Sequence, residues 1–216
     1  EAPIVYEVDR ARDGKSFSTR RVVAIQHGQT ILNCSASFQH DEPGAEHQLS
    51  MPEVPAPEDL DPPQPVDPEQ FSHLSAKLQR WLARGGPFEF RHVYPRDEIK
   101  VPKRPPFQHV WFRLVDRVGD EPDLHRAMLA YASDFHLIGT TTFPHGISYL
   151  QPNVQMASLD HTIWFHRPFR ADEWLLYVVD SPSASAARGL VRGQFFTQDG
   201  KLVASTMQEG LIRKWE

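Results

Sequence analysis

Alternating apolar positions mark the first elements of the chain. Ile4, Tyr6 and Val8 are spaced two residues apart, which is the pattern of a β-strand with one buried face. The pairs Asp13-Gly14 and His27-Gly28 are turn signals that close hairpins. This region is therefore predicted to form three antiparallel strands.

A proline-rich stretch and a short helical pattern come next. Between residues 41 and 70, prolines recur from Pro52 to Pro68 among many acidic residues. Because proline lacks an amide hydrogen and restricts the backbone, this composition predicts a linker rather than regular structure. Apolar side chains from Phe71 to Leu82 then recur at helical spacing, and Gly85-Gly86 ends the predicted helix.

The rest of the chain predicts a second helix and a set of strands. An apolar stripe from Leu124 to Phe135 predicts a helix with Asp120 as its N-cap and Pro122 in its first turn. Strands are expected at residues 88–94, 110–114, 158–166, 174–180, 188–197 and 201–213. One helix followed by a long antiparallel meander gives an α+β architecture, with the helix packed on one face of the sheet.

One strand pattern occurs twice, about 171 residues apart. Val5-Tyr6-Glu7-Val8-Asp9 resembles Leu176-Tyr177-Val178-Val179-Asp180, and a basic strand and a glycine turn follow each. Such a repeat indicates one structural unit used twice. The second copy has a long structured segment before it, whereas the first copy has very little. We therefore expect a first unit at residues 1–40 without its opening strand and helix, a linker with a short helix at 41–86, and a second unit at 87–216.

Composition narrows the class of protein. A length of 216 residues is ample for a buried core, and a formal charge of −5 argues against a general nucleic-acid-binding protein. No apolar run approaches the ~20 residues of a membrane span. The single cysteine, Cys34, cannot form an intrachain disulfide and suits a reducing compartment. We expect a cytoplasmic protein with no membrane span and no nucleic-acid partner.

Several longer stretches of the sequence are distinctive. These are Ala157–Phe169, Glu173–Tyr177, Arg188–Gly193 and Gln208–Gly210, together with Asp13–Val22 near the start. They resemble the acyl-CoA thioesterase II family, with the first of the two units N-terminally incomplete. The resemblance implies a double hotdog fold, hydrolysis of acyl-CoA to a fatty acid and CoA without a cofactor, and assembly as a homo-oligomer.

Asp134 is the candidate base that the residues themselves suggest. It lies near the C-terminal end of the predicted helix, where the macrodipole disfavours an anion by about 0.3–1 kcal/mol. Partial burial beside the apolar stripe would make its carboxylate a better base, and the alternative is a solvated aspartate at a helix end. In the family the motif Tyr131–Asp134 carries the catalytic aspartate, so the resemblance implies this role for Asp134.

The resemblance also implies two partners for this carboxylate. Gln208, in the last predicted strand, offers a donor and an acceptor that do not titrate. Ser158 matches a position where the family supplies a hydroxyl. Together Asp134, Ser158 and Gln208 would hold the water that attacks the thioester, and no acyl-enzyme would form.

Arg188 and Arg192 are candidates for binding the substrate's phosphates. CoA is polyanionic, and the arginine guanidinium recognises phosphate with two hydrogen bonds. A solvated strand face is an equally good interpretation of the same two residues.

Other reactive groups favour structural interpretations. There is no G-x-S-x-G motif for a serine nucleophile, and Cys34 lies in a predicted strand. Asp160 and His161 are neighbours on a predicted strand, so they would point to opposite faces. The eleven histidines show no convincing metal-ligand spacing. One alternative function is a non-catalytic acyl-CoA-binding or assembly module with a degenerate first unit. Another is a hotdog dehydratase, which would need a histidine and a carboxylate that converge in the pocket.

Overall fold

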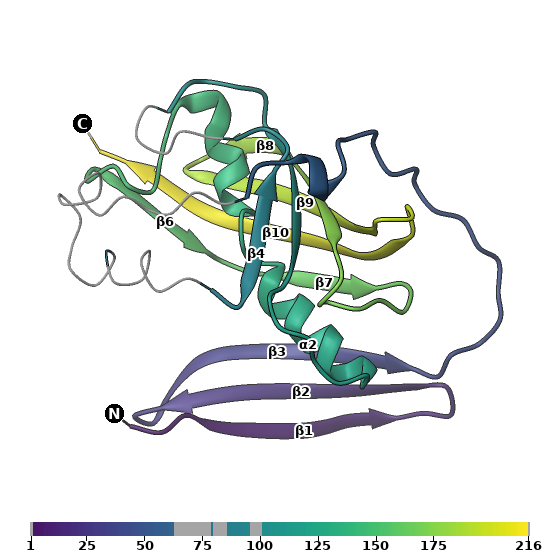
Figure 1. The fold of residues 1–216 in the computed structure, drawn as a ribbon. Helices are drawn as coiled ribbons and strands as arrows, with labels where there is room; N and C mark the ends of the chain where they lie inside the picture. Colours follow the sequence, from purple (N-terminus) through teal and green to yellow (C-terminus); the bar gives the residue numbers. More distant parts are fainter. Residues whose placement is uncertain (1, 63–78, 80–85, 96–100, 216) are drawn as a thin grey trace. The chain divides into compact units, whose positions relative to one another are not determined.

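The chain separates into two compact units, Glu1–His47 and Gln48–Glu216 (Figure 1). The computed structural model describes residues 2–62, 79, 86–95 and 101–215. The apolar positions that predicted a helix from Phe71 to Leu82 lie outside these residues. In the described part of the chain, no helix has the length and apolar character needed to cross a bilayer.

The first unit is an antiparallel sheet in the order β1-β2-β3. Its strands are β1 Val5–Asp13, β2 Phe17–Gln26 and β3 Gln29–Gln39. Between β2 and β3, His27 and Gly28 have φ values of 50° and 74°. Two successive positive φ values are what a two-residue type I′ turn requires. The three predicted strands and this turn are confirmed.

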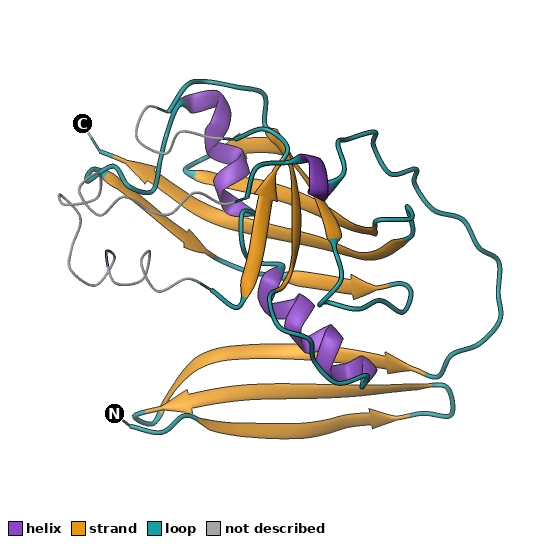
Figure 2. Ribbon diagram, viewed as in Figure 1, coloured by secondary structure: helices purple, strands orange, loops and turns teal. Residues whose placement is uncertain are grey.

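The second unit is built on a larger antiparallel sheet (Figure 2). Its strands follow the order β4-β5-β8-β9-β10-β6, and β7 also pairs with β10. The strands are β4 Phe88–His92, β5 Phe107–Leu114, β6 Val154–Ser158, β7 Thr162–Phe165, β8 Leu175–Ser185, β9 Arg188–Thr197 and β10 Leu202–Lys214. The α-helix between β5 and β6 is α2 Pro122–Ala132, and the 3₁₀ helices with defined bounds are η1 Pro57–Asp59 and η3 Ile138–His145. The predicted α+β architecture is confirmed.

The strand expected at residues 158–166 is wrong in one respect, because residues 159–161 interrupt it. There the carboxylate of Asp160 accepts the backbone N–H of Glu209 over 2.8 Å, and the N–H of Leu159 donates to the carbonyl of Glu209 over 2.9 Å. A side chain thus takes the place of a backbone partner, and β6 and β7 become separate strands along β10.

The start of the helix also differs from the prediction. Glu121, not Asp120, is the N-cap of α2. Asp120 instead accepts a hydrogen bond from the guanidinium of Arg170, so its carboxylate is not available to cap the helix. Pro122 opens the helix as predicted, which suits a residue whose missing N–H is not needed there.

The two faces of the second sheet bury different clusters. On one face, Leu129 and Ala132 of α2 pack with sheet residues that include Phe112, Tyr177 and Phe195. The other face buries an aromatic and aliphatic cluster, Trp111, Trp174, Leu176, Phe196 and Leu202, against Met51, Val54 and Leu60.

The described part of the proline-rich stretch is irregular apart from η1, and we call its residues 48–60 the strap. Polar contacts fasten the strap to the second unit. The side chain of Gln48 donates to Gly200 O over 2.8 Å and accepts from Leu202 N over 3.1 Å, and the indole N–H of Trp111 donates to Pro55 O over 2.9 Å. The strap is therefore packed on the sheet and does not act as a simple spacer.

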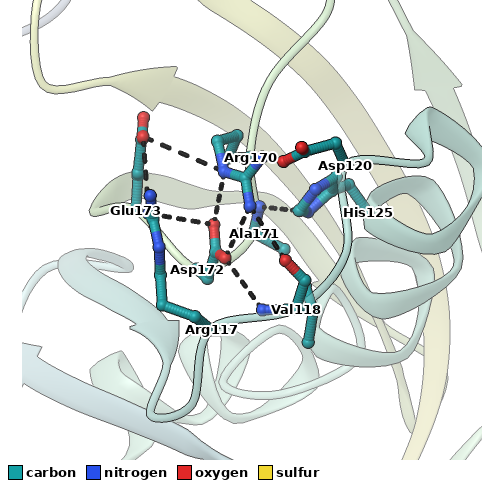
Figure 3. Close-up of polar contacts among 8 residues, drawn as sticks. All are labelled: Arg117, Val118, Asp120, His125, Arg170, Ala171, Asp172 and Glu173. Atoms are coloured by element: carbon teal, nitrogen blue, oxygen red, sulfur yellow. Dashed lines mark hydrogen bonds and ion pairs between the residues drawn. The ribbon is translucent and has the colours of Figure 1, made fainter.

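A group of ionic side chains holds the loop before β8 against the start of α2 (Figure 3). The guanidinium of Arg170 donates to both carboxylate oxygens of Asp172 over 2.8 Å and to the carbonyl of Val118 over 3.1 Å. Asp172 also accepts the N–H of Val118, and the ring Nδ1 of His125 accepts the N–H of Ala171. The N-terminal end of the helix is thus fixed to the loop.

Candidate active site

The side chains of Asp134, Ser158 and Gln208 meet at one carboxylate oxygen. Nε2 of Gln208 donates to Oδ1 of Asp134 over 2.6 Å, and Oγ of Ser158 donates to the same oxygen over 3.4 Å. The first distance is that of a strong charge-assisted hydrogen bond and the second is that of a weak one. These two donors fix the orientation of the carboxylate and leave Oδ2 available to a third group.

Each of the three residues is placed by a different element. Asp134 directly follows Ser133, the C-cap of α2. Ser158 ends β6, where it lies opposite Gly210 of β10. Gln208 lies two residues earlier in β10, and residues two apart on a strand share a face. The pairing of β6 with β10 therefore brings the hydroxyl and the amide to the end of the helix.

The burial of the three side chains is uneven. Gln208 is 1% exposed, whereas Asp134 and Ser158 are both exposed. The expected partial burial of Asp134 is therefore wrong, because the helix ends at Ala132 and the aspartate no longer continues its apolar stripe. Oε1 of Gln208 is buried and has no hydrogen-bond partner among the described residues. Within the described part of the chain, the buried side-chain amide thus makes one hydrogen bond, to Asp134.

A cavity of about 790 Å³ lies within the second unit, and its lining does not include Asp134, Ser158 or Gln208 themselves. Its apolar lining includes Phe90, Phe135, Ile138, Phe143, Tyr149 and Met156. Phe135 directly follows Asp134, and Met156 precedes Ser158 by two residues on the same face of β6. Ile138 lies so close to Gly210 that no Cβ would fit between them. The lining thus includes chain neighbours of Asp134 and Ser158, and a residue packed on Gly210, two residues after Gln208.

Sequence reasoning missed a contact that adjoins the group. Nε2 of His161 lies 2.7 Å from Oγ of Ser133, the residue before Asp134. Burial lowers the pKa of His161, although the carboxylates of Asp134 and Asp160 act in the opposite direction. Asp160 points to the backbone of Glu209 instead. Asp160 and His161 thus bond to different groups, as predicted. The prediction assumed a continuous strand, however, and residues 159–161 interrupt that strand.

The structure does not bring Arg188 and Arg192 to the same group. Val191 lies opposite Gln208 across the β9–β10 pair, and neighbouring residues on a strand face opposite sides. Both arginines are therefore on the other face of the sheet. There Arg192 forms an ion pair with Asp180 at 2.6 Å, and Arg188 lies 3.4 Å from Glu209.

Comparisons with known proteins match this chain to acyl-CoA thioesterases over nearly its whole length. A family model described as "Acyl-CoA thioesterase" matches residues 73–211, and one described as "Acyl-CoA thioesterase N-terminal domain" matches residues 1–39. Acyl-CoA thioesterase 2 of Haemophilus influenzae is 42% identical over 211 residues, which are 98% of this chain and 74% of that protein.

Solved structures give the fold. The chain is similar to an acyl-CoA thioesterase II from Mycobacterium marinum, with a TM-score of 0.76, 41% identity, and coverage of 99% of this chain and 75% of the other. A hot dog fold protein from Alicyclobacillus acidocaldarius has a TM-score of 0.74 at 18% identity, with coverage of 99% and 74%, and bears on the fold alone. The predicted double hotdog fold is confirmed.

Proposed function

Because the chain belongs to the acyl-CoA thioesterase II family, a family of thioester hydrolases, we propose that it hydrolyses acyl-CoA with a water activated by Asp134. The observation that supports this most directly is the pair of donors on one carboxylate oxygen, from Gln208 and Ser158. They leave Oδ2 to accept a proton from water, and the exposure of Asp134 lets water and substrate reach it.

The reaction then needs two proton transfers. Asp134 takes a proton from the water as its oxygen bonds to the thioester carbonyl carbon, which gives a tetrahedral oxyanion. When the carbonyl re-forms, the C–S bond breaks and the CoA sulfur takes the proton from Asp134. The products are a carboxylic acid and free CoA, and the carboxylate is regenerated without a covalent intermediate. The amide of Gln208 holds the carboxylate and carries no charge of its own.

The cavity beside the three residues is the proposed site of the acyl group. Aromatic and aliphatic side chains form much of its lining and favour a hydrocarbon chain, while Asp59, Asp61, His92 and His136 add polar groups. A volume of about 790 Å³ is in the range of sites for small molecules. An acyl chain in this cavity would lie beside Phe135 and Met156. The thioester carbon would then be close to Asp134 and Ser158, which are their near neighbours in the chain.

The test is thiol release from a medium-chain acyl-CoA by the parent chain and by Asp134→Asn. We expect the variant to lose about a hundredfold or more in kcat with an unchanged circular dichroism spectrum. Asp123→Asn is the matched control, because Asp123 is an exposed carboxylate of the same helix. Turnover retained by Asp134→Asn would remove Asp134 as the base. Saturable binding of acyl-CoA by a folded parent chain without turnover would favour the non-catalytic module instead.

A further inference from the structure

The segment that follows Ser158 is fastened to the strand that carries Gln208. The carboxylate of Asp160 and the N–H of Leu159 both bond to the backbone of Glu209. His161 completes this short segment before β7 begins. The histidine therefore stands on a part of the backbone that β10 holds in place.

From this segment the His161 ring reaches the end of the helix. Its Nε2 lies 2.7 Å from Oγ of Ser133, and the Ser133 hydroxyl donates to Ala130 O over 2.9 Å. A hydroxyl has one proton to donate. A carbonyl oxygen can only accept, so the proton is assigned to the bond with Ala130, and the hydrogen in the contact with Ser133 is assigned to Nε2 of His161. The histidine is the donor, and the neutral ring supplies this hydrogen from Nε2.

Ser133 is held a second time, through its backbone. The hydroxyl of Tyr177 donates to the Ser133 carbonyl over 2.8 Å, and Oγ1 of Thr206 lies 3.1 Å from the same hydroxyl. Burial raises the pKa of Tyr177 well above its ordinary value, so the phenol keeps its proton. Gly193 makes room for this arrangement, since a Cβ there would meet both the Tyr177 ring and Thr206.

Ser133 is fully buried, and the next residue is Asp134. The side chain of Ser133 contacts His161, in the segment that follows Ser158, and the carbonyl of Ser133 accepts a hydrogen bond from Tyr177 of the sheet. A small displacement of Ser133 would therefore move the carboxylate of Asp134 away from Gln208 and Ser158. Misplacement of a reacting group by about 1 Å can cost a hundredfold in rate.

We propose that His161 is a positioning residue of the thioesterase reaction, which sets Asp134 against Ser158 by donating a hydrogen bond to Ser133. This rests on the proposed function, in which Asp134 is the base. His161 itself touches neither the water nor the thioester in this role, and it acts through the end of α2.

The test compares His161→Leu, which removes the donor, with His161→Gln, which can restore one. We expect His161→Leu to lower kcat about tenfold to a hundredfold with KM within about twofold of the parent. His161→Gln should recover most of that loss. His166→Leu is the matched control, since His166 makes a similar 2.9 Å contact with the Ser205 hydroxyl at an exposed position, and it should keep the parent kcat.

Ser133→Ala provides an independent measurement if His161→Leu folds poorly. It should lower kcat to a similar degree, and the double variant should be no slower than either single variant, because both remove one interaction. Each of three results would overturn the proposal. These are a parent kcat in His161→Leu, equal losses of kcat in His161→Leu and His161→Gln, and additive losses of kcat in the double variant. Asp134→Asn in the same assay tests the base separately, so that failure of the proposed function can be recognised.

Discussion

Nε2 of Gln208 lies 2.6 Å from Oδ1 of Asp134, and this hydrogen bond joins the last strand to the residue that follows helix α2. The amide is buried and does not titrate, so its hydrogen-bond donor is present at every pH at which the protein is folded. A cationic donor in its place would form an ion pair with the carboxylate and make it a weaker base. The contact therefore suits the role of base that we propose for Asp134.

Removing this amide should lower catalysis without removing the base. We expect Gln208→Leu to reduce kcat about tenfold to a hundredfold, because Asp134 loses its shorter hydrogen bond and its preferred orientation. Steady-state thiol release by the folded variant measures the change. Gln194→Leu is the control, since Gln194 lies on β9 with its side chain on the other face of the sheet. A Gln208→Leu variant with the parent kcat would exclude this role for the amide.

Patterns within short stretches of the sequence predicted the elements that form through residues close together in the chain. Alternating apolar positions located the strands, and the His27-Gly28 pair located a turn with two positive φ values. Asp134, Ser158 and Gln208 were predicted to act together only through the resemblance to the thioesterase family. These three residues come from separate elements, so periodicity by itself could not have joined them.

The differences from the prediction arise from partners distant in sequence. Asp120 does not cap the helix because it pairs with Arg170, 50 residues later. The strand at residues 158–166 is interrupted because Asp160 bonds to Glu209, 49 residues later. The strap packs on the sheet where Trp111 can donate to Pro55. Proline content predicts irregular backbone, but it does not reveal what that backbone packs against.

The strap should loosen when its hydrogen bond to Trp111 is removed. Trp111 is 2% exposed, and its indole N–H donates to Pro55 O over 2.9 Å. We expect Trp111→Phe to lower the free energy of unfolding by about 0.5–1.5 kcal/mol, the net contribution of a typical hydrogen bond, because Pro55 O loses its donor. Hydrogen exchange should also become faster in residues 48–60. Trp164→Phe, at a half-exposed position, serves as the control, and equal exchange in both variants would contradict the prediction.

His136 should make the protein less stable in mild acid. Burial and the charge of His92 lower the pKa of His136 from 6.5 to about 3. The unfolded chain therefore binds one more proton than the folded chain between these values, and stability falls as the pH falls. The slope is at most about 1.4 kcal/mol per pH unit, so the loss from pH 6.5 to pH 5 is up to about 2 kcal/mol.

His136→Asn removes this group and tolerates the same backbone, since asparagine accepts the positive φ of 63° found there. Urea unfolding of both proteins at pH 7 and at pH 5 measures the difference. The parent should lose more stability than the variant over this interval. If the stability of the parent and of His136→Asn depended on pH in the same way, the pKa of His136 would be the same in the folded and unfolded chains, and the prediction would be wrong.

Asp172 should be more important for stability than other carboxylates near the start of α2. Its side chain is 1% exposed, and it accepts two hydrogen bonds from Arg170 and one from the N–H of Val118 (Figure 3). Arg170 holds the pKa of Asp172 well below its ordinary value. The stabilisation is therefore complete above the pKa of the unfolded carboxyl group and is lost as the pH falls through that of the folded one.

Asp172→Asn should lower the free energy of unfolding at pH 7 by about 1.5–3 kcal/mol, the contribution typical of hydrogen bonds to a charged group. Urea unfolding checks this value, with Asp123→Asn as the control. Asp123 forms an exposed pair with Arg126, and its loss should change stability by less than about 1 kcal/mol. If the two variants were equally stable, Arg170 and Asp172 would not fix the helix start. Because α2 ends next to Asp134, a loosened start should also reduce kcat in Asp172→Asn.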